Sequence, residues 1–397
     1  MFIKTCQAVL LAIWLSGLNL DSHASSFFSN PPKPDSRGFL PLFNGRNLDG
    51  WVNVNCAPET WSVTNGLIHC TGNPIGALRT ERQYENFILE LEWRHLKSGG
   101  NAGIFIWSSP ISAPGVPFLR AVEVQVLDHG YGNTENYTTH GDVFPIHGST
   151  MEPFGKHRGM RSFPSEQRSN PSPEWNKYRI VATNGVIRLS VNGKEVSGGS
   201  NCNWRKGYIG LESEGSRVDF RNIRIQELPS TGATPEQSAP EETDWTALYN
   251  GVDLRGWKSS NLAEWQSNDW QLFLIPDEQK KASLSTTKSY RDFELSVDFK
   301  TPAKLPTSGT IGGLTLDDQT IVSFGDSEAP MSIGLDKLKP KAWNRVRLVR
   351  DFERFSVYLN GQFIGKTTVA TKRSAEVGLA NAGQPLEFAN IYIRPLR

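Results

Sequence analysis

The fold class is indicated most directly by one stretch, Ala121-Val122-Glu123-Val124-Gln125-Val126-Leu127. Polar Glu123 and Gln125 alternate in it with three valines, a period of two that is typical of a β-strand with one apolar and one polar face. Residues 88–94 alternate in the same way. Both segments are therefore predicted to be strands that are half solvated, and Glu123 and Gln125 leave the same face, about 7 Å apart.

The segments between such strands carry hairpin signals. Asn-Gly pairs, whose residues tolerate the positive φ of two-residue turns, stand at 65–66, 184–185, 192–193 and 360–361. We find no convincing amphipathic helix. Many short strands with regular turns predict an all-β chain of antiparallel β-sandwich domains of the concanavalin-like jelly-roll type.

The sequence repeats itself. Residues 42–51 reappear at 248–257, an offset of 206 residues, whereas 174–176 reappear at 342–344, an offset of 168. The chain is therefore interpreted as a tandem duplication, in which the first copy carries 38 additional residues between about 94 and 174. Because the two copies differ most in this insertion, we expect function to reside there.

The repeat suggests the domain boundaries. We predict one sandwich at 38–229, a second at 244–397, and a solvated linker at 230–243, which is rich in proline, serine, threonine and glutamate. A short polar start, a short apolar run and a small-residue cleavage site predict a signal peptide at 1–24. An uncleaved N-terminal anchor is the alternative. We expect export to the periplasm or the external medium and no membrane span after cleavage.

The net charge bears on the binding partners, and the cysteine content bears on the disulfides. With 42 basic and 41 acidic residues the net charge is +1, so no nucleic-acid partner is expected. Cleavage would leave Cys56, Cys70 and Cys202. A Cys56–Cys70 bridge is the favoured disulfide in an exported protein, with Cys202 free or buried.

Titratable residues are unevenly distributed. Five of the histidines fall between 95 and 157, and the second copy has none. Because histidine is the commonest acid or base near neutral pH, catalysis is assigned to the first copy. The alternative is a polar surface loop. A metal held by His140, Asp142 and His147 with Glu123 or Asp128 stays open, but no established metal-ligand spacing supports it, and no cofactor is expected.

Other residues predict sugar binding. Asn101 lies in a glycine-rich loop, and strand parity puts the side chain of Trp107 on the same side as that of Asn101. An aromatic face beside amides and carboxylates suits a sugar, whose C–H groups stack and whose hydroxyls form hydrogen bonds. The alternatives are a Trp107 in the core and a Glu123 face that is merely solvated.

These residues together resemble the 3-keto-disaccharide hydrolase domain family of secreted concanavalin-like sandwiches. The resemblance spans 38–229 and rests on motifs at 42–45, 84–94, 100–105, 123–128, 174–176 and 220–225. The second copy looks like the same fold without these motifs and is predicted to be non-catalytic. In the first copy, Trp107 stands where the family often has arginine, and Glu212 lies in a departure from the family's usual Leu-Gln-x-His-Gly.

The resemblance implies cleavage of 3-keto-glycosides by abstraction of the C2 proton, elimination at C1 and hydration. It suggests catalytic roles for Glu123, Asp128, His140 and His147. It suggests substrate contacts for Arg79, Glu92, Asn101, Trp107, Gln125, Asp142 and Glu212. The alternative is a non-catalytic, lectin-like secreted protein, and a conventional glycosidase is disfavoured because the sequence singles out no pair of carboxylates.

Overall fold

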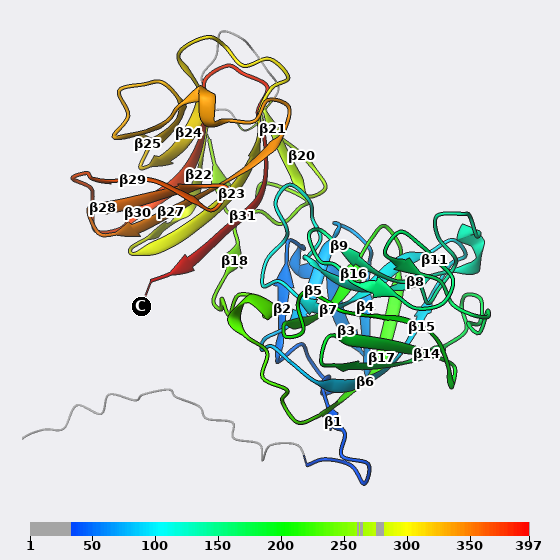
Figure 1. The fold of residues 1–397 in the computed structure, drawn as a ribbon. Coiled ribbons are helices and arrows are strands. Elements are labelled where there is room, and N and C mark those ends of the chain that lie inside the picture. The colour runs from blue at the N-terminus through cyan, green and yellow to red at the C-terminus, as the bar shows by residue number, and fades with distance from the viewer. Residues whose placement is uncertain (1–32, 260–261, 263–264, 275–281, 397) are drawn as a thin grey trace, which may run out of the picture. The chain divides into compact units, whose positions relative to one another are not determined.

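A computed structural model describes residues 33–259, 262, 265–274 and 282–396 (Figure 1). The predicted signal peptide, 1–24, lies outside the described residues. Most regular structure is β-strand. The helices in the described part of the chain are short 3-10 turns: η1 (Pro58–Thr60), η2 (His129–Tyr131), η3 (Pro235–Gln237) and η5 (Leu335–Lys337). The all-β prediction is confirmed.

The first copy forms two antiparallel sheets. The larger comprises β1 (Leu40–Pro41), β3 (Trp61–Thr64), β4 (Leu67–Cys70), β6 (Phe87–His95), β10 (Glu152–Pro153), β13 (Asn176–Thr183), β14 (Val186–Val191), β15 (Lys194–Ser200) and β17 (Val218–Glu227). They are ordered β10-β15-β14-β13-β6-β17-β4-β3, with β1 paired to β17.

The smaller sheet of the first copy carries the alternating stretch. It comprises β2 (Trp51–Val54), β5 (Gly76–Thr80), β7 (Asn101–Ser108), β8 (Ala121–Leu127), β9 (Val143–Ile146), β11 (His157–Arg158), β12 (Arg161–Ser162) and β16 (Tyr208–Ser213). Their order is β11-β12-β9-β8-β7-β16-β5-β2, so β7 lies between β8 and β16. Leu89 and Trp93 from β6 share one buried core with Val124 from β8 and Leu211 from β16. The two sheets therefore form a sandwich.

The second copy repeats this arrangement. One sheet comprises β18 (Thr246–Ala247), β20 (Trp265–Asn268), β21 (Gln271–Leu274), β23 (Phe293–Lys300), β27 (Trp343–Asp351), β28 (Arg354–Leu359), β29 (Gln362–Thr368) and β31 (Glu387–Pro395). The other comprises β19 (Trp257–Lys258), β22 (Ala282–Tyr290), β24 (Thr310–Leu316), β25 (Gln319–Gly325), β26 (Met331–Ile333) and β30 (Ala375–Asn381). The latter are ordered β19-β22-β30-β24-β25-β26. A separate core packs the two sheets together.

The backbone dihedral angles confirm the turns predicted at the Asn-Gly pairs. At all four Asn-Gly pairs both residues have positive φ, for example 49° at Asn184 and 76° at Gly185. Strand β6 shows the expected alternation of buried and partly exposed side chains except at Glu90, which is only 5% exposed. Strand β8 does not, because Glu123 and Gln125 are each only 6% exposed. The expectation of a solvated face is therefore wrong for 121–127, and this polar face is covered.

One further expectation is corrected. Cys56, Cys70 and Cys202 are all buried with free thiols, so the Cys56–Cys70 bridge is not formed. The segment predicted as a solvated linker, 230–243, is mostly exposed, and some of its residues also bond to the first sandwich. The Asn86 amide donates to the Thr231 hydroxyl at 3.1 Å, and the Gln83 amide donates to the Ala239 carbonyl at 2.9 Å.

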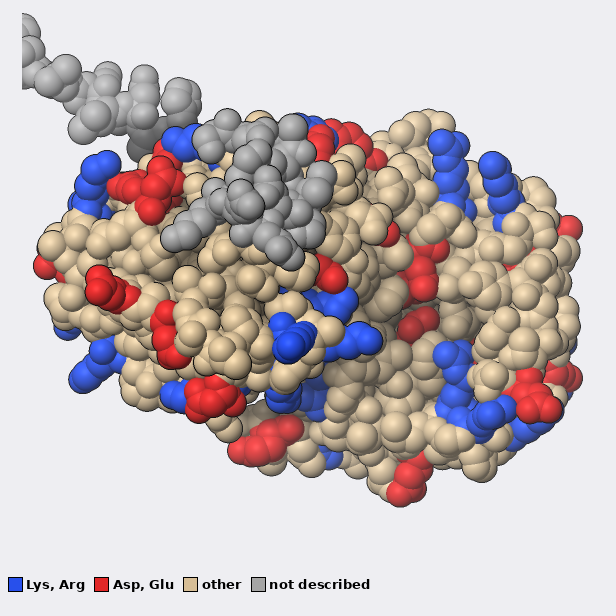
Figure 2. Space-filling model, turned by 90° about the horizontal axis from the view of Figure 1, so that it is seen from above, with Lys and Arg blue, Asp and Glu red and all other residues tan. Residues whose placement is uncertain are grey.

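The surface charge matches the near-zero net charge. On the face seen in Figure 2, basic and acidic side chains are interspersed, and no large area of that face carries a single sign. No helix in the described part of the chain combines the length and the apolar character that crossing a bilayer requires.

One hydrogen bond across the core ties the sheets together beneath the polar face of β8. The buried Tyr178 hydroxyl, on β13, donates to the Gln125 carbonyl at 2.8 Å. We expect Tyr178→Phe to lower the free energy of unfolding by about 1–2 kcal/mol, because a buried acceptor loses a donor. Thermal unfolding followed by circular dichroism checks this. An unchanged melting temperature would argue against a structural role for the hydroxyl.

Candidate active site

Two carboxyl groups flank a glycine on the covered face of the smaller sheet. Gly103 on β7 pairs with Gln125 on β8, and Glu212 lies on the other neighbour, β16. A Cβ atom on Gly103 would stand 2.7 Å from Oε1 of Glu123 and 2.9 Å from Oε2 of Glu212. Only a residue without a side chain fits there, so the glycine brings the Glu123 and Glu212 carboxyls together.

These carboxyls have unusual proton affinities. Burial, with the nearby carboxyls of Glu214 and Asp142, raises the pKa of Glu123 to about 8. Burial and the Glu123 and Glu214 carboxyls raise the pKa of Glu212 well above its ordinary value. Burial also raises the pKa of Glu214. Because like charges in a low-dielectric site cannot all ionise, protons are retained here at neutral pH.

Amides orient one end of the cluster. The Asn101 side chain donates to Glu214 Oε2 at 2.5 Å, and its oxygen accepts from Gln125 Nε2 at 2.9 Å. These bonds fix the amide orientations, because each amide has one acceptor side and one donor side. The structure therefore brings together Asn101, Gln125 and the acidic residues, as the sequence predicts for Glu123 and Gln125.

The guanidinium of Arg161 lies at the other end of this acidic cluster. Arg161 donates to Asp142 Oδ2 at 3.0 Å and lies over the Phe144 ring, 3.2 Å from its centroid. Its charge opposes the rise in the Glu123 pKa. Arg161 and Glu214 were not among the sequence-predicted residues. Glu214 has a sequence signal, since it stands two residues after Glu212 and directly follows the end of β16. Arg161 has none, because its position depends on the insertion.

Asp128 has a structural role at the end of β8. Its carboxylate accepts from the backbone N–H groups of Gly99 at 2.7 Å, Gly130 at 2.9 Å and Ser172 at 2.8 Å. Burial opposes ionisation, but these donors outweigh it and lower the pKa of Asp128 to about 2. A carboxyl held ionised by three N–H groups is a poor proton donor, so the prediction that Asp128 is a catalytic acid loses its physical basis.

The histidines do not form a cluster with Glu123. His147 stacks on Phe118 with ring centroids 5.8 Å apart, and burial lowers its pKa. His140 is buried, and neither ring nitrogen has a hydrogen-bond partner within the described structure. Burial and the neighbouring His129 lower the pKa of His140 to about 4, which leaves it neutral.

Three predicted substrate contacts lie elsewhere. Arg79 donates to the Pro110 carbonyl at 2.7 Å and lies over the Tyr208 ring. Glu92 accepts from Arg221 at 2.7 Å on the larger sheet. The parity argument fails for Trp107, because a bulge in the β7–β16 pairing and a φ of 53° turn its indole into the core, where it donates to the Glu85 carbonyl.

The described residues contain no group of three or more histidine, cysteine, aspartate or glutamate side chains arranged to hold a metal ion. In particular, His140, Asp142 and His147 make separate contacts: His140 with His129, Asp142 with Arg161, and His147 with Phe118. The hypothesis of a metal held by these residues has no support in their geometry.

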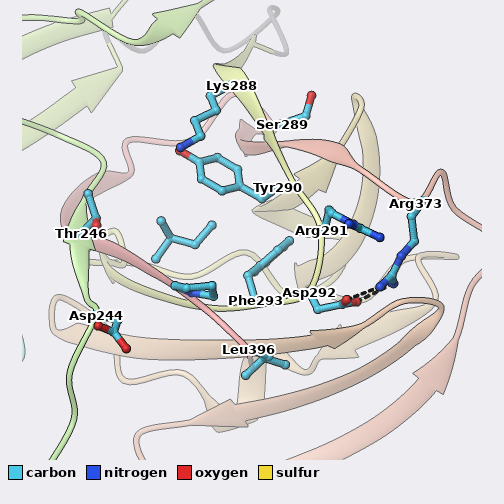
Figure 3. Close-up of a pocket in the computed structure, with 12 residues that line it drawn as sticks. Asp244, Thr246, Lys288, Ser289, Tyr290, Arg291, Asp292, Phe293, Arg373 and Leu396 are labelled. Atoms are coloured by element: carbon cyan, nitrogen blue, oxygen red, sulfur yellow. Dashed lines mark hydrogen bonds and ion pairs between the residues drawn. The ribbon is translucent and has the colours of Figure 1, made fainter. Parts of the chain in front are cut away.

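A hollow in the second copy has different chemistry from the carboxyl pair. It has a volume of about 810 Å³ and lies beside the end of β22 (Figure 3). Arg373 donates to Asp292 at 2.8 Å and lowers the pKa of that carboxyl, whereas Lys288 and Arg291 are exposed. It therefore offers an ordinary ion pair and exposed cations rather than carboxyls that retain protons.

We predict that the free energy of unfolding depends on pH because of the buried Glu123 carboxyl. Between pH 4.5 and about 8 the unfolded chain loses this proton while the folded chain keeps it, so the free energy of unfolding falls as pH rises. Glu123→Gln removes that loss and should stabilise the protein by roughly 3–5 kcal/mol at pH 8, with little effect at pH 4. Urea unfolding across this range measures it.

The matched control is Glu92→Gln, which removes a partly exposed surface carboxylate and should change stability by less than about 1 kcal/mol at either pH. Equal effects of the two substitutions at pH 8 would contradict the raised pKa of Glu123.

Asp128→Asn should give the opposite pH dependence. Its ionised form stabilises the fold above the unfolded pKa near 3.9, and this contribution is lost as pH falls towards 2. We expect a loss of about 2–3 kcal/mol at pH 7 that shrinks at pH 2.5, measured by thermal unfolding. A loss that is constant with pH would show that the charge of Asp128 is not what the three N–H groups stabilise.

Comparisons with known proteins place the chain. A curated 3-keto-disaccharide hydrolase of Bacteroides thetaiotaomicron is 23% identical over 253 residues, covering 49% of this chain and 80% of the relative. A Parabacteroides distasonis structure provisionally described as a glycosyl hydrolase is 26% identical, with a TM-score of 0.37, covering 48% of this chain and 99% of that one. The CBM66 carbohydrate binding module of Bacillus subtilis matches with 12% identity and a TM-score of 0.32, covering 45% and 96%.

The family model matches twice, in agreement with the tandem repeat. It describes a 3-keto-alpha-glucoside-1,2-lyase-like domain and matches residues 38–226 and 244–394, which together make up most of the chain. The motif-based resemblance and the duplicated folds lead to the same assignment. This chain belongs to the 3-keto-alpha-glucoside-1,2-lyase-like domain family.

Proposed function

We propose that the first copy cleaves the glycosidic bond of 3-keto-glycosides, with Glu123 and Glu212 exchanging the protons. The observation that carries this is the pair of buried carboxyls on either side of Gly103, both with raised pKa values. Family membership and the curated relative's name support the substrate class.

The proposed reaction conserves every proton. A ketone at C3 acidifies the C2–H bond, so a base removes that proton and an enolate forms. The bond from C1 to the aglycone oxygen breaks as the enone forms, and an acid protonates the leaving oxygen. Water then adds across C1 and C2, its oxygen to C1 and its proton to C2. The products are a free 3-keto sugar and the aglycone alcohol.

The surroundings of the two carboxyls assign the roles. The Arg161 charge favours the ionised form of Glu123, so the Glu123 carboxylate is the proposed base. Burial and the Glu123 and Glu214 carboxyls raise the pKa of Glu212, which is therefore the proposed acid for the leaving oxygen. Arg161, which interacts electrostatically with Glu123, is the proposed stabiliser of the enolate. Asn101 and Gln125 are proposed to bind sugar hydroxyls.

A second candidate deserves a test because of the same carboxyl pair. Two carboxyls on one sheet face are also what a retaining glycosidase uses on an unoxidised sugar, one as acid and the other as nucleophile. The sequence alone identified no such pair. Non-catalytic sugar binding is the third candidate, supported by the carbohydrate-related family.

The proposed base makes turnover pH-dependent. We predict that kcat/KM rises with pH as Glu123 ionises, reaching half its maximum near pH 8 and levelling about one pH unit higher. Glu123→Gln should lower kcat by 100-fold or more and remove that rise, because the amide accepts no proton. Release of sugar from 3-keto-trehalose and 3-keto-lactose, followed by NMR, measures both.

His147→Ala is the matched control, since His147 packs on Phe118 away from the carboxyl pair, and it should leave turnover within about twofold. Unoxidised trehalose and lactose form the comparison arm. Turnover of these sugars would favour the retaining glycosidase, and binding without turnover of any substrate would favour the lectin-like reading. Full activity of Glu123→Gln would refute the assigned base.

We also propose that the mature protein is exported and begins after residue 24. The apolar run and small-residue site in residues 1–24 support this. N-terminal sequencing of the protein recovered from periplasmic and external fractions tests it.

A further inference from the structure

The second copy has a hollow on the face that corresponds to the carboxyl pair. In the first copy, Leu211 of β16 pairs with Ile104 of β7. In the second, Leu379 of β30 pairs with Leu314 of β24, and all four are core residues. This shared register makes β30 the counterpart of β16 and β24 the counterpart of β7. Residues on the outer faces can therefore be compared position by position.

The comparison shows that charge has been removed from this face. Four charged or amide residues of the first copy have small neutral counterparts. These are Ala380 for Glu212, Ala382 for Glu214, Ser323 for Gln125 and Ser285 for Arg79. The glycine is kept, since Gly313 pairs with Ser323 as Gly103 pairs with Gln125. The paired carboxyls that the proposed cleavage needs are absent from these positions.

A threonine in place of a phenylalanine helps to open the hollow. In the first copy Phe105 packs against Gly210, where a Cβ atom would lie 3.0 Å from its ring. The same place over Gly378 is taken by Thr315, whose hydroxyl would clash with a Cβ atom at that position. Thr315 is 2% exposed, and its hydroxyl has no hydrogen-bond partner within the described structure. A buried hydroxyl without a partner is costly unless a ligand or water satisfies it.

The hollow has a volume of about 320 Å³, and Thr315 lies in its wall. Other hydroxyl and amide groups line it: Ser283, Thr310, Thr320, Ser323 and Asn381. Asp318 adds one carboxylate, which accepts from the Ser285 hydroxyl at 3.1 Å. No lysine or arginine is among the described lining residues. Thr310, Ser323 and Asn381 already bond within the protein. Thr315, Ser283, Thr320 and Asp318 are left to meet sugar hydroxyls, and the described lining offers no cation to an anionic ligand.

We propose that this hollow, bounded by β22, β24, β25 and β30, is a separate site that binds a neutral saccharide without cleaving it. It goes beyond the function proposed for the first copy, because it is a second site with a different chemistry. The Thr315 hydroxyl and the Asp318 carboxylate meet sugar hydroxyls, and the alanines leave room for the ring.

The test uses the full chain and two neutral probes, maltotetraose and cellotetraose, by isothermal titration calorimetry. Ala380→Trp fills the hollow and should weaken binding of the preferred tetrasaccharide at least tenfold, while turnover of 3-keto-trehalose by the first copy stays unchanged. Lys366→Trp adds the same side chain on the other sheet and should leave binding unchanged.

Two conservative substitutions of Thr315 keep the test valid if the Ala380→Trp variant fails to fold. Thr315→Val keeps the shape and removes the hydroxyl, and should weaken binding about fivefold; Thr315→Ser keeps the hydroxyl and should retain affinity. Tetrasaccharide binding that is unaffected by both Ala380→Trp and Thr315→Val overturns the proposal. So does the absence of binding to the wild-type chain. Loss of turnover alone would concern only the function proposed for the first copy.

Discussion

The site of the first copy depends on one electrostatic constraint: three acidic side chains share a covered sheet face from which water is largely removed. Glu123, Glu212 and Glu214 repel one another when ionised, and burial amplifies that repulsion. The face tolerates them because protons stay bound and because Asn101 and Arg161 supply compensating contacts at its two ends. The sandwich beneath must be stable enough to hold them there.

The backbone supplies that stability through regular features that the sequence predicts well. Alternation in 121–127 and the Asn-Gly turns are local patterns, and each is observed as strand or hairpin. The tandem repeat was also readable, because motifs recur at fixed offsets. Placing Glu123 and Gln125 on one face needed only the period of the strand. That much of the site follows from seven residues.

The rest of the site depends on contacts between distant segments, which no local pattern encodes. A single bulge between β7 and β16 moved Trp107 from the expected face into the core. Asp128 was predicted to be a catalytic acid, but the backbone N–H groups of Gly99 and of Ser172, which is 44 residues away in sequence, converge on its carboxylate. Arg161 reaches the acidic face only because the insertion folds back onto β9. The sequence therefore identified candidate site residues more readily than it predicted the groups that surround them in the folded chain.

The retained backbone register between the copies has a consequence for how this chain can change. A site built from mutually repelling acids lowers the stability of the domain that holds it, which limits the further mutations that domain tolerates. Where Ala380, Ala382 and Ser323 take the place of the charged and amide groups, that burden is lifted. Duplication thus leaves one copy under a strict stability limit and gives the other freedom to vary its surface, so sequence drift should concentrate in the second half of the chain.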